Sequence, residues 1–134
     1  EIKLIDVEKW EVIQVFKGHE DLVVSVDLDE GGARLVSVGR DKKLILWDLA
    51  TGQPLKSISE KIGEFSDVLF VPGKELCAVR GSGFLDVYEV PTLELRKTHK
   101  LSTHACTTAV ATPDGKEILT LENVELSGIR AYQP

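Results

Sequence analysis

The 134-residue sequence contains no methionine and only two cysteines. The missing initiator predicts that the chain is part of a longer one. No apolar run approaches the roughly 20 residues that a membrane helix needs, and no signal-peptide pattern opens the chain. Cys77 and Cys106 fit no metal-ligand spacing, so we expect buried thiols, with a disulfide as the alternative. These features predict an intracellular protein, cytoplasmic or nuclear, that needs no metal or other cofactor.

Basic residues are in the minority, with 16 Lys and Arg against 22 Asp and Glu and a net charge of −6. A nucleic-acid surface would need clustered Lys and Arg, so the sequence has no direct nucleic-acid signal. The acidic excess is sufficient to keep the protein soluble. Apolar residues make up 43% and charged residues 28%, which is typical of one globular domain.

Helical periodicity is also absent, since no window longer than about ten residues is amphipathic at a period of 3.6. The stretch Gly18–Asp48 instead predicts three short strands, VVSVDL, RLVSV and LILW. The first two alternate apolar and polar residues, which is the pattern of a strand with one buried face. Glu30-Gly31-Gly32 and Arg40-Asp41-Lys42 separate the strands, and glycine reaches the positive φ of tight turns.

A repeat runs through the whole chain. The hexamers EIKLID, KLILWD, FLDVYE and GIRAYQ place Ile5, Trp47, Tyr88 and Tyr132 at separations of 42, 41 and 44 residues. A period of about 40–45 residues is that of a four-stranded propeller blade. Short strands and turn signals recur in the same order within each period, which favours an all-β stack of antiparallel sheets.

The central stretch, with Gly18-His19 near its start and Trp47-Asp48 at its end, resembles one repeat of the WD-repeat family. The resemblance implies a β-propeller of which about three blades are present, a partial arc of a larger propeller. The expected units are the end of one blade (1–17), two blades (18–58 and 59–100) and an incomplete blade (101–134). We expect GIRAYQ to be the third strand of the last blade, after a loop or frayed edge over 122–128. The remaining blades would come from the same chain or another one.

The resemblance also implies a structural hydrogen-bond network of His19, Ser37, Asp41 and Trp47. Its chemistry is plausible on physical grounds, because a buried imidazole gains a charged partner from a carboxylate and a buried indole N–H needs an acceptor. The same residue types occur in hydrolases, but no Gly-x-Ser-x-Gly pattern surrounds Ser37 and the spacing fits a structural role better. We therefore expect no catalytic residue and no metal ligand.

Partner contacts in the family lie three and five residues after the blade histidine and directly before the turn aspartate. The resemblance thus marks Leu22, Val24 and Arg40 as partner-binding candidates, although Leu22 and Val24 could instead pack the blade. Similar places in the other blades fall at Glu64, Ser66, Ala105 and Thr107. The implied function is a non-enzymatic scaffold that docks protein partners in a multiprotein assembly. The alternative is a substrate adaptor that reads a peptide or a modification with the same loop face.

Overall fold

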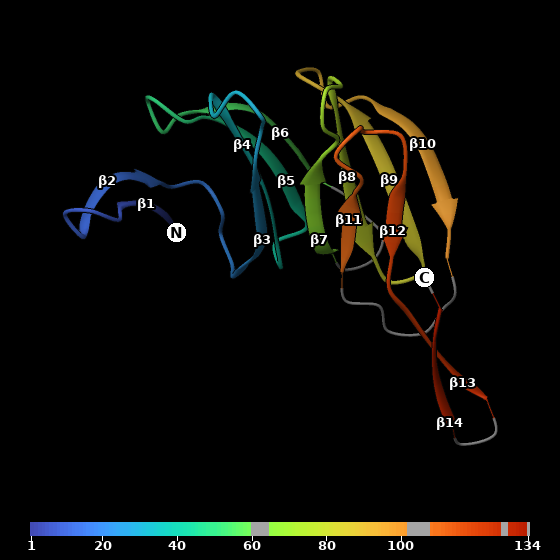
Figure 1. Ribbon diagram of the computed structural model, residues 1–134. Helices are drawn as coiled ribbons and strands as arrows, with labels where there is room; N and C mark the ends of the chain where they lie inside the picture. Colours follow the sequence, from blue (N-terminus) through green and yellow to red (C-terminus); the bar gives the residue numbers. More distant parts are fainter. Residues whose placement is uncertain (60–64, 102–107, 127–128, 134) are drawn as a thin grey trace.

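The protein is built from strands and turns, and the part of the chain that the structure describes contains no helix. A computed structural model describes residues 1–59, 65–101, 108–126 and 129–133, with backbone only for the last two strands. Figure 1 shows β1 to β12 grouped into small sheets that follow one another in sequence order, with β13 and β14 extending away from them. The all-β fold expected from the sequence is confirmed.

Two four-stranded antiparallel sheets form the centre of the molecule. Sheet I has the order β3–β4–β5–β6, formed by Val23–Leu28, Arg34–Gly39, Lys43–Asp48 and Pro54–Ser59. Sheet II has the order β7–β8–β9–β10, formed by Phe65–Phe70, Leu76–Gly81, Phe84–Glu89 and Leu95–Lys100. Their first strand pairs share a register, since Val23 faces Gly39 in sheet I and Phe65 faces Gly81 in sheet II.

Two-stranded sheets flank this centre. β1 (Ile2–Asp6) pairs with β2 (Glu11–Phe16), and β11 (Ala109–Ala111) pairs with β12 (Ile118–Thr120). β13 (Glu122–Leu126) pairs with β14 (Ile129–Gln133) in a sheet of its own. The prediction of a loop over 122–128 was wrong for residues 122–126, which form β13. The GIRAYQ hexamer, expected as the third strand of the last blade, supplies β14, which pairs with β13 and not with β12. Only two residues separate β13 from β14, which is the connection length of the tightest hairpins, so local pairing forms this sheet.

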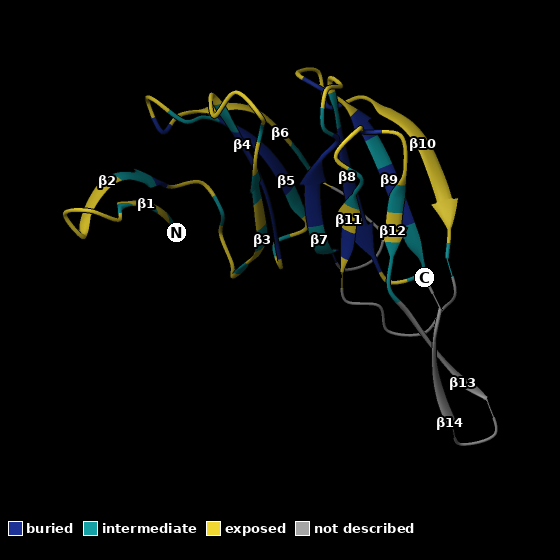
Figure 2. Cartoon of the chain, viewed as in Figure 1, coloured by how far each residue is buried: buried dark blue, intermediate teal, exposed yellow. Residues whose placement is uncertain are grey.

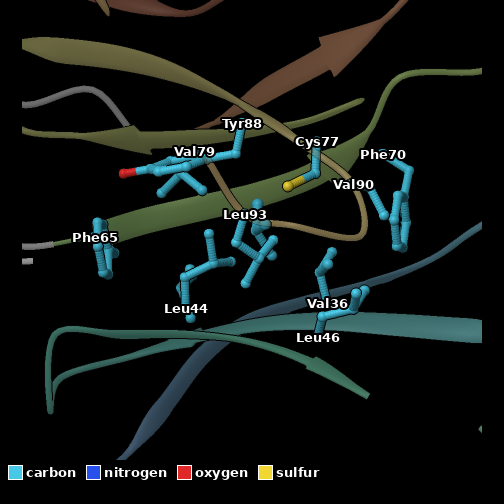
Figure 3. Packing of buried hydrophobic residues seen from close by; sticks show 12 residues of the cluster. Val36, Leu44, Leu46, Phe65, Phe70, Cys77, Val79, Tyr88, Val90 and Leu93 are labelled. Atoms are coloured by element: carbon cyan, nitrogen blue, oxygen red, sulfur yellow. The ribbon is translucent and has the colours of Figure 1, made fainter. Parts of the chain in front are cut away.

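The main core lies between the two four-stranded sheets (Figure 3). Sheet I contributes Val36, Val38, Leu44 and Leu46. Sheet II contributes Phe65, Val68, Phe70, Cys77, Val79 and Tyr88, and the turn between β9 and β10 adds Val90 and Leu93. The opposite face of sheet I buries Leu35, Ile45 and Trp47 against Phe16 of β2. Because β5 is covered on both faces, its apolar residues run without alternation, as the LILW pattern indicated. Each fully buried aliphatic side chain contributes about 1.5–3 kcal/mol.

Polar contacts join the first strands of neighbouring sheets. The Asp67 carboxylate on β7 accepts hydrogen bonds from the Ser25 hydroxyl at 2.6 Å and from the Thr108 hydroxyl at 3.0 Å. It also accepts the Ala109 backbone N–H at 3.0 Å, while Asp27 on β3 accepts the N–H of Phe70 at 2.8 Å. These contacts hold the sheets as successive blades of an open arc, and Figure 2 shows burial greatest where sheets face each other.

Candidate functional site

Four side chains of sheet I meet in one hydrogen-bonded chain. The imidazole of His19, just before β3, lies 3.0 Å from both carboxylate oxygens of Asp41 through Nδ1, and Nε2 lies 2.6 Å from Ser37 Oγ. The Trp47 indole N–H donates to the same Ser37 oxygen at 2.8 Å. Ser37 and Trp47 are fully buried, and the side chains of His19 and Asp41 are only 2% and 5% exposed. The structure thus brings together all four residues selected from the sequence.

The proton positions in this network follow from its geometry. Asp41 is acceptor-only, so Nδ1 of His19 carries a proton, and in the neutral imidazole Nε2 is then the acceptor. The Ser37 hydroxyl then donates to Nε2 while its oxygen accepts the Trp47 N–H. Every side-chain N and O atom of these four residues has a hydrogen-bond partner, which is the condition under which a buried network stabilises a protein.

Asp41 holds the turn between β4 and β5 in place. Its carboxylate accepts the backbone N–H of Glu20 at 2.8 Å and that of Lys43 at 3.2 Å, in addition to His19. Burial acts to raise the pKa of Asp41, but these hydrogen bonds outweigh it and hold the pKa below the ordinary 3.8. The turn is therefore fixed to the loop before β3 by an ionised carboxylate.

The network also requires a glycine at the end of β4. A Cβ on Gly39 would lie 2.8 Å from Asp41 Oδ1 and 2.8 Å from His19 Nδ1. Both atoms belong to the bonded pair, so neither can move without breaking the contact. Gly39 is a position where only hydrogen fits, a constraint that the turn pattern alone did not reveal.

Sheet II does not reproduce the network. By register Ser37 faces Ile45, whereas the matching pair in sheet II is Val79 and Asp86. Valine has no hydroxyl, and the Tyr88 hydroxyl lies 3.5 Å from a carboxylate oxygen of Asp86. The complete chain of donors and acceptors is therefore a feature of sheet I within the described residues.

The three partner-binding candidates lie on the surface beside this network. Leu22, Val24 and Arg40 are all exposed. The backbone N–H of Arg40 donates to the Leu22 carbonyl at 2.8 Å, so the two residues are adjacent on one rim. Of the corresponding places elsewhere, Ser66 is half-buried and its hydroxyl donates to the Arg80 carbonyl at 3.2 Å. Glu64, Ala105 and Thr107 lie outside the described residues.

Sequence reasoning missed a cluster of ion pairs that lies at the end of β3 and the start of β4, opposite to the rim. Arg34 pairs with Asp29 in its own sheet at 3.0 Å and reaches both carboxylate oxygens of Glu75 in sheet II, at 3.1 and 3.2 Å. The hydrogen bonds that Arg34 donates to Glu75, and then the one that it donates to Asp29, raise the pKa of Arg34. A groove of about 510 Å³ runs beside them between the two sheets. One period, 41 residues, separates Arg34 from Glu75, and that spacing was the available signal.

Reactive groups are sparse in the part of the chain that can be described. Those residues include no group of three or more His, Cys, Asp and Glu side chains placed to hold a metal ion. Cys77 lies in the core between the sheets, and burial raises the pKa of its thiol to about 12. Among the same residues, no helix has the length and apolar character needed to span a membrane.

Successive antiparallel sheets, stacked face to face in sequence order with the first strands linked by polar contacts, define a β-propeller protein. Comparison with known proteins agrees, because residues 10–48 match the family "WD domain, G-beta repeat". That match spans the His19 loop and the first three strands of sheet I. Residues 10–48 therefore contain a repeat of the WD type.

Named relatives cover parts of the chain. A Xenopus laevis protein called p21-activated protein kinase-interacting protein 1-like is 33% identical over 87 residues, which is 63% of this chain and 23% of the relative. Ribosome biogenesis protein BOP1 homologs of Drosophila erecta and Drosophila melanogaster are each 43% identical over 44 residues, 33% of this chain and 6% of theirs. The chain thus spans less than a quarter of the length of these relatives.

Proposed function

We propose that this chain is a non-enzymatic scaffold that docks protein partners within a multiprotein assembly. The observation that carries the proposal is the exposed rim formed by Leu22, Val24 and Arg40 beside a buried network. The relatives support it by name, since one is a kinase-interacting protein and others act in ribosome biogenesis. Those names, together with the buried thiol of Cys77, also favour a cytoplasmic or nuclear location.

The network would serve this function by fixing the rim. Arg40 directly precedes Asp41, whose carboxylate is tied to His19 and to two backbone N–H groups. A side chain on a fixed turn loses less conformational freedom when it binds, which favours affinity. Arg40 would contact a partner carboxylate through its planar guanidinium, and Leu22 and Val24 would supply apolar contact beside it.

The proposal includes the units of the arc. Residues 1–17 would end one blade, 18–58 and 59–100 would form two complete blades, and 101–134 would belong to a fourth. The open arc needs further blades, from the same chain or another one, to close a propeller of the usual size.

Alanine substitution of the rim tests the docking function. Leu22→Ala, Val24→Ala and Arg40→Ala are compared with Leu55→Ala, which changes an exposed leucine on β6 away from the rim. Bound proteins are quantified by mass spectrometry after affinity capture, with circular dichroism as the check on folding. Loss of many partners from the rim variants alone supports the scaffold. Loss of one class of peptide favours the substrate adaptor, and unchanged capture would show that the rim is not the docking surface.

A further inference from the structure

The outermost strand of sheet II, β10, has an unusual charge for an acidic protein. Its six residues include Arg96, Lys97 and Lys100, together with His99, and no Asp or Glu. The chain as a whole has a net charge of −6, so the sign of the charge is reversed on this strand. All six residues are exposed, and Figure 2 shows the exposure along the whole strand. The cations of β10 therefore face solvent on the outside of the sheet.

The fold makes little use of these cations. The guanidinium of Arg96 lies 3.9 Å from a carboxylate oxygen of Glu89, and the two side chains are 60% and 49% exposed. A long ion pair in water contributes little to stability, because solvent screens the charges. Lys97 and Lys100 have no ion-pair partner in the part of the chain that the structure describes. All three cations are therefore available to bind another molecule.

The outer strand of sheet I, β6, shows what this position requires. β6 and β10 are each the last strand of a four-stranded sheet, but the only charged residue of β6 is Lys56. Sheet I packs against β2 on one face and against sheet II on the other, and every residue of β6 except Ile58 is still exposed. The exposure of an outer strand is therefore a property of its place in the blade, and neighbouring blades do not remove it.

The free edge of β10 can accept a further strand. Among the described strands β10 pairs only with β9, so the backbone groups along its other edge have no strand partner. Lysine on an edge strand discourages pairing with other sheets. One lysine is present on β6, so this protection does not explain three cations on β10. The same cations repel a second copy of β10 and attract a strand of opposite charge.

We infer that β10 binds an acidic, extended segment of a partner protein, which adds to sheet II as a fifth strand. Lys97 lies opposite Val87 and Lys100 opposite Phe84 on β9, so the two lysines point to opposite faces of the sheet. Acidic residues at adjacent positions of the added strand would each meet one lysine, and opposite charges across strands stabilise pairing. A nucleic acid could contact the cations but could not extend the sheet, so the two features together favour a peptide. This surface is separate from the rim and does not depend on it.

Fluorescence anisotropy of a labelled peptide with the repeat Glu-Glu-Val-Thr, titrated with the 134-residue chain, tests the inference. Lys97→Glu with Lys100→Glu should weaken binding about tenfold or more, because two attractive pairs across strands become repulsive. The matched control, Lys9→Glu with Lys56→Glu, changes the net charge equally at exposed lysines outside β10 and should bind the peptide as the wild type does. All four lysines are exposed, so both variants should keep the circular dichroism of the wild type.

A second peptide tests whether the segment binds as a strand. Replacing each valine of the peptide with proline keeps its charge but removes N–H donors, so binding should weaken about tenfold or more. Binding of the first peptide should also slow hydrogen exchange of the β10 amides. Absence of peptide binding would overturn the inference, as would equal binding by the two double variants or by the two peptides. Tighter binding of a single-stranded oligonucleotide of equal charge would overturn it in favour of a nucleic-acid surface. Arg40→Ala should bind the peptide as the wild type does, which separates this test from that of the rim.

Discussion

Removal of one buried hydroxyl, by Ser37→Ala, should destabilise the protein far more than its size suggests. The Ser37 oxygen accepts the Trp47 indole N–H at 2.8 Å and contacts His19 Nε2 at 2.6 Å. Both partners would be left in a dry site, and an unsatisfied buried polar group costs about 1–3 kcal/mol. The expected loss in the free energy of unfolding is therefore about 2–5 kcal/mol.

Ser57 provides a matched control for this substitution. Both serines pair with Ile45, Ser37 from β4 and Ser57 from β6, but Ser57 is exposed. Ser57→Ala should change stability by less than about 0.5 kcal/mol, the usual range of surface substitutions. Urea unfolding of both variants, followed by tryptophan fluorescence, measures the difference. Equal stability of the two variants would refute the claim that the hydroxyl completes an essential network.

Three further predictions follow from the same structure. The pKa of Asp41 is lower in the folded protein than the unfolded value of 3.8, so its contribution to stability is present above 3.8 and is lost as pH falls through the lower folded value. Asp41→Asn should abolish that part of the acid sensitivity when unfolding is measured from pH 6 downward. Cys77, with a thiol pKa of about 12, should react with a disulfide reagent only as fast as the protein opens, and rapid labelling of the native protein would contradict its burial. His19→Ala and Trp47→Ala should each lower the melting temperature more than Tyr88→Ala, and scanning calorimetry that found equal shifts would count against a special role for the network.

The sequence predicted sheet I well because its signals are local. Alternation in β3, the glycine turn and the continuous apolar run of β5 each specify a strand from a few adjacent residues. The resemblance to a WD repeat selected His19, Ser37, Asp41 and Trp47, and the structure places these side chains in contact. Local pattern and tertiary contact agree there, as expected where every level of the sequence favours the same fold.

The features that were missed depend on contacts between repeats or on competition between strands. Nothing near Arg34 indicates that its partner is Glu75, one repeat away. The strand β13 was missed because analogy with the other blades predicted that β14 pairs with β12. In the structure β14 pairs with β13 instead, and the short connection between them costs little entropy to close. The left-handed backbone of Trp10, with a φ of 56°, was missed although the same position in the next repeat is Gly52, the residue type that favours a positive φ.

The central claim is that sheets I and II are separate blades packed face to face. Nuclear Overhauser effects between labelled methyl groups and aromatic rings test it most directly. The account predicts contacts from Val36 and Leu46 of sheet I to the rings of Phe70 and Tyr88 of sheet II, with backbone contacts between strands confined to each sheet. Backbone contacts between adjacent strands that joined β5 to β9 would place Trp47 and Tyr88 on one sheet and contradict it.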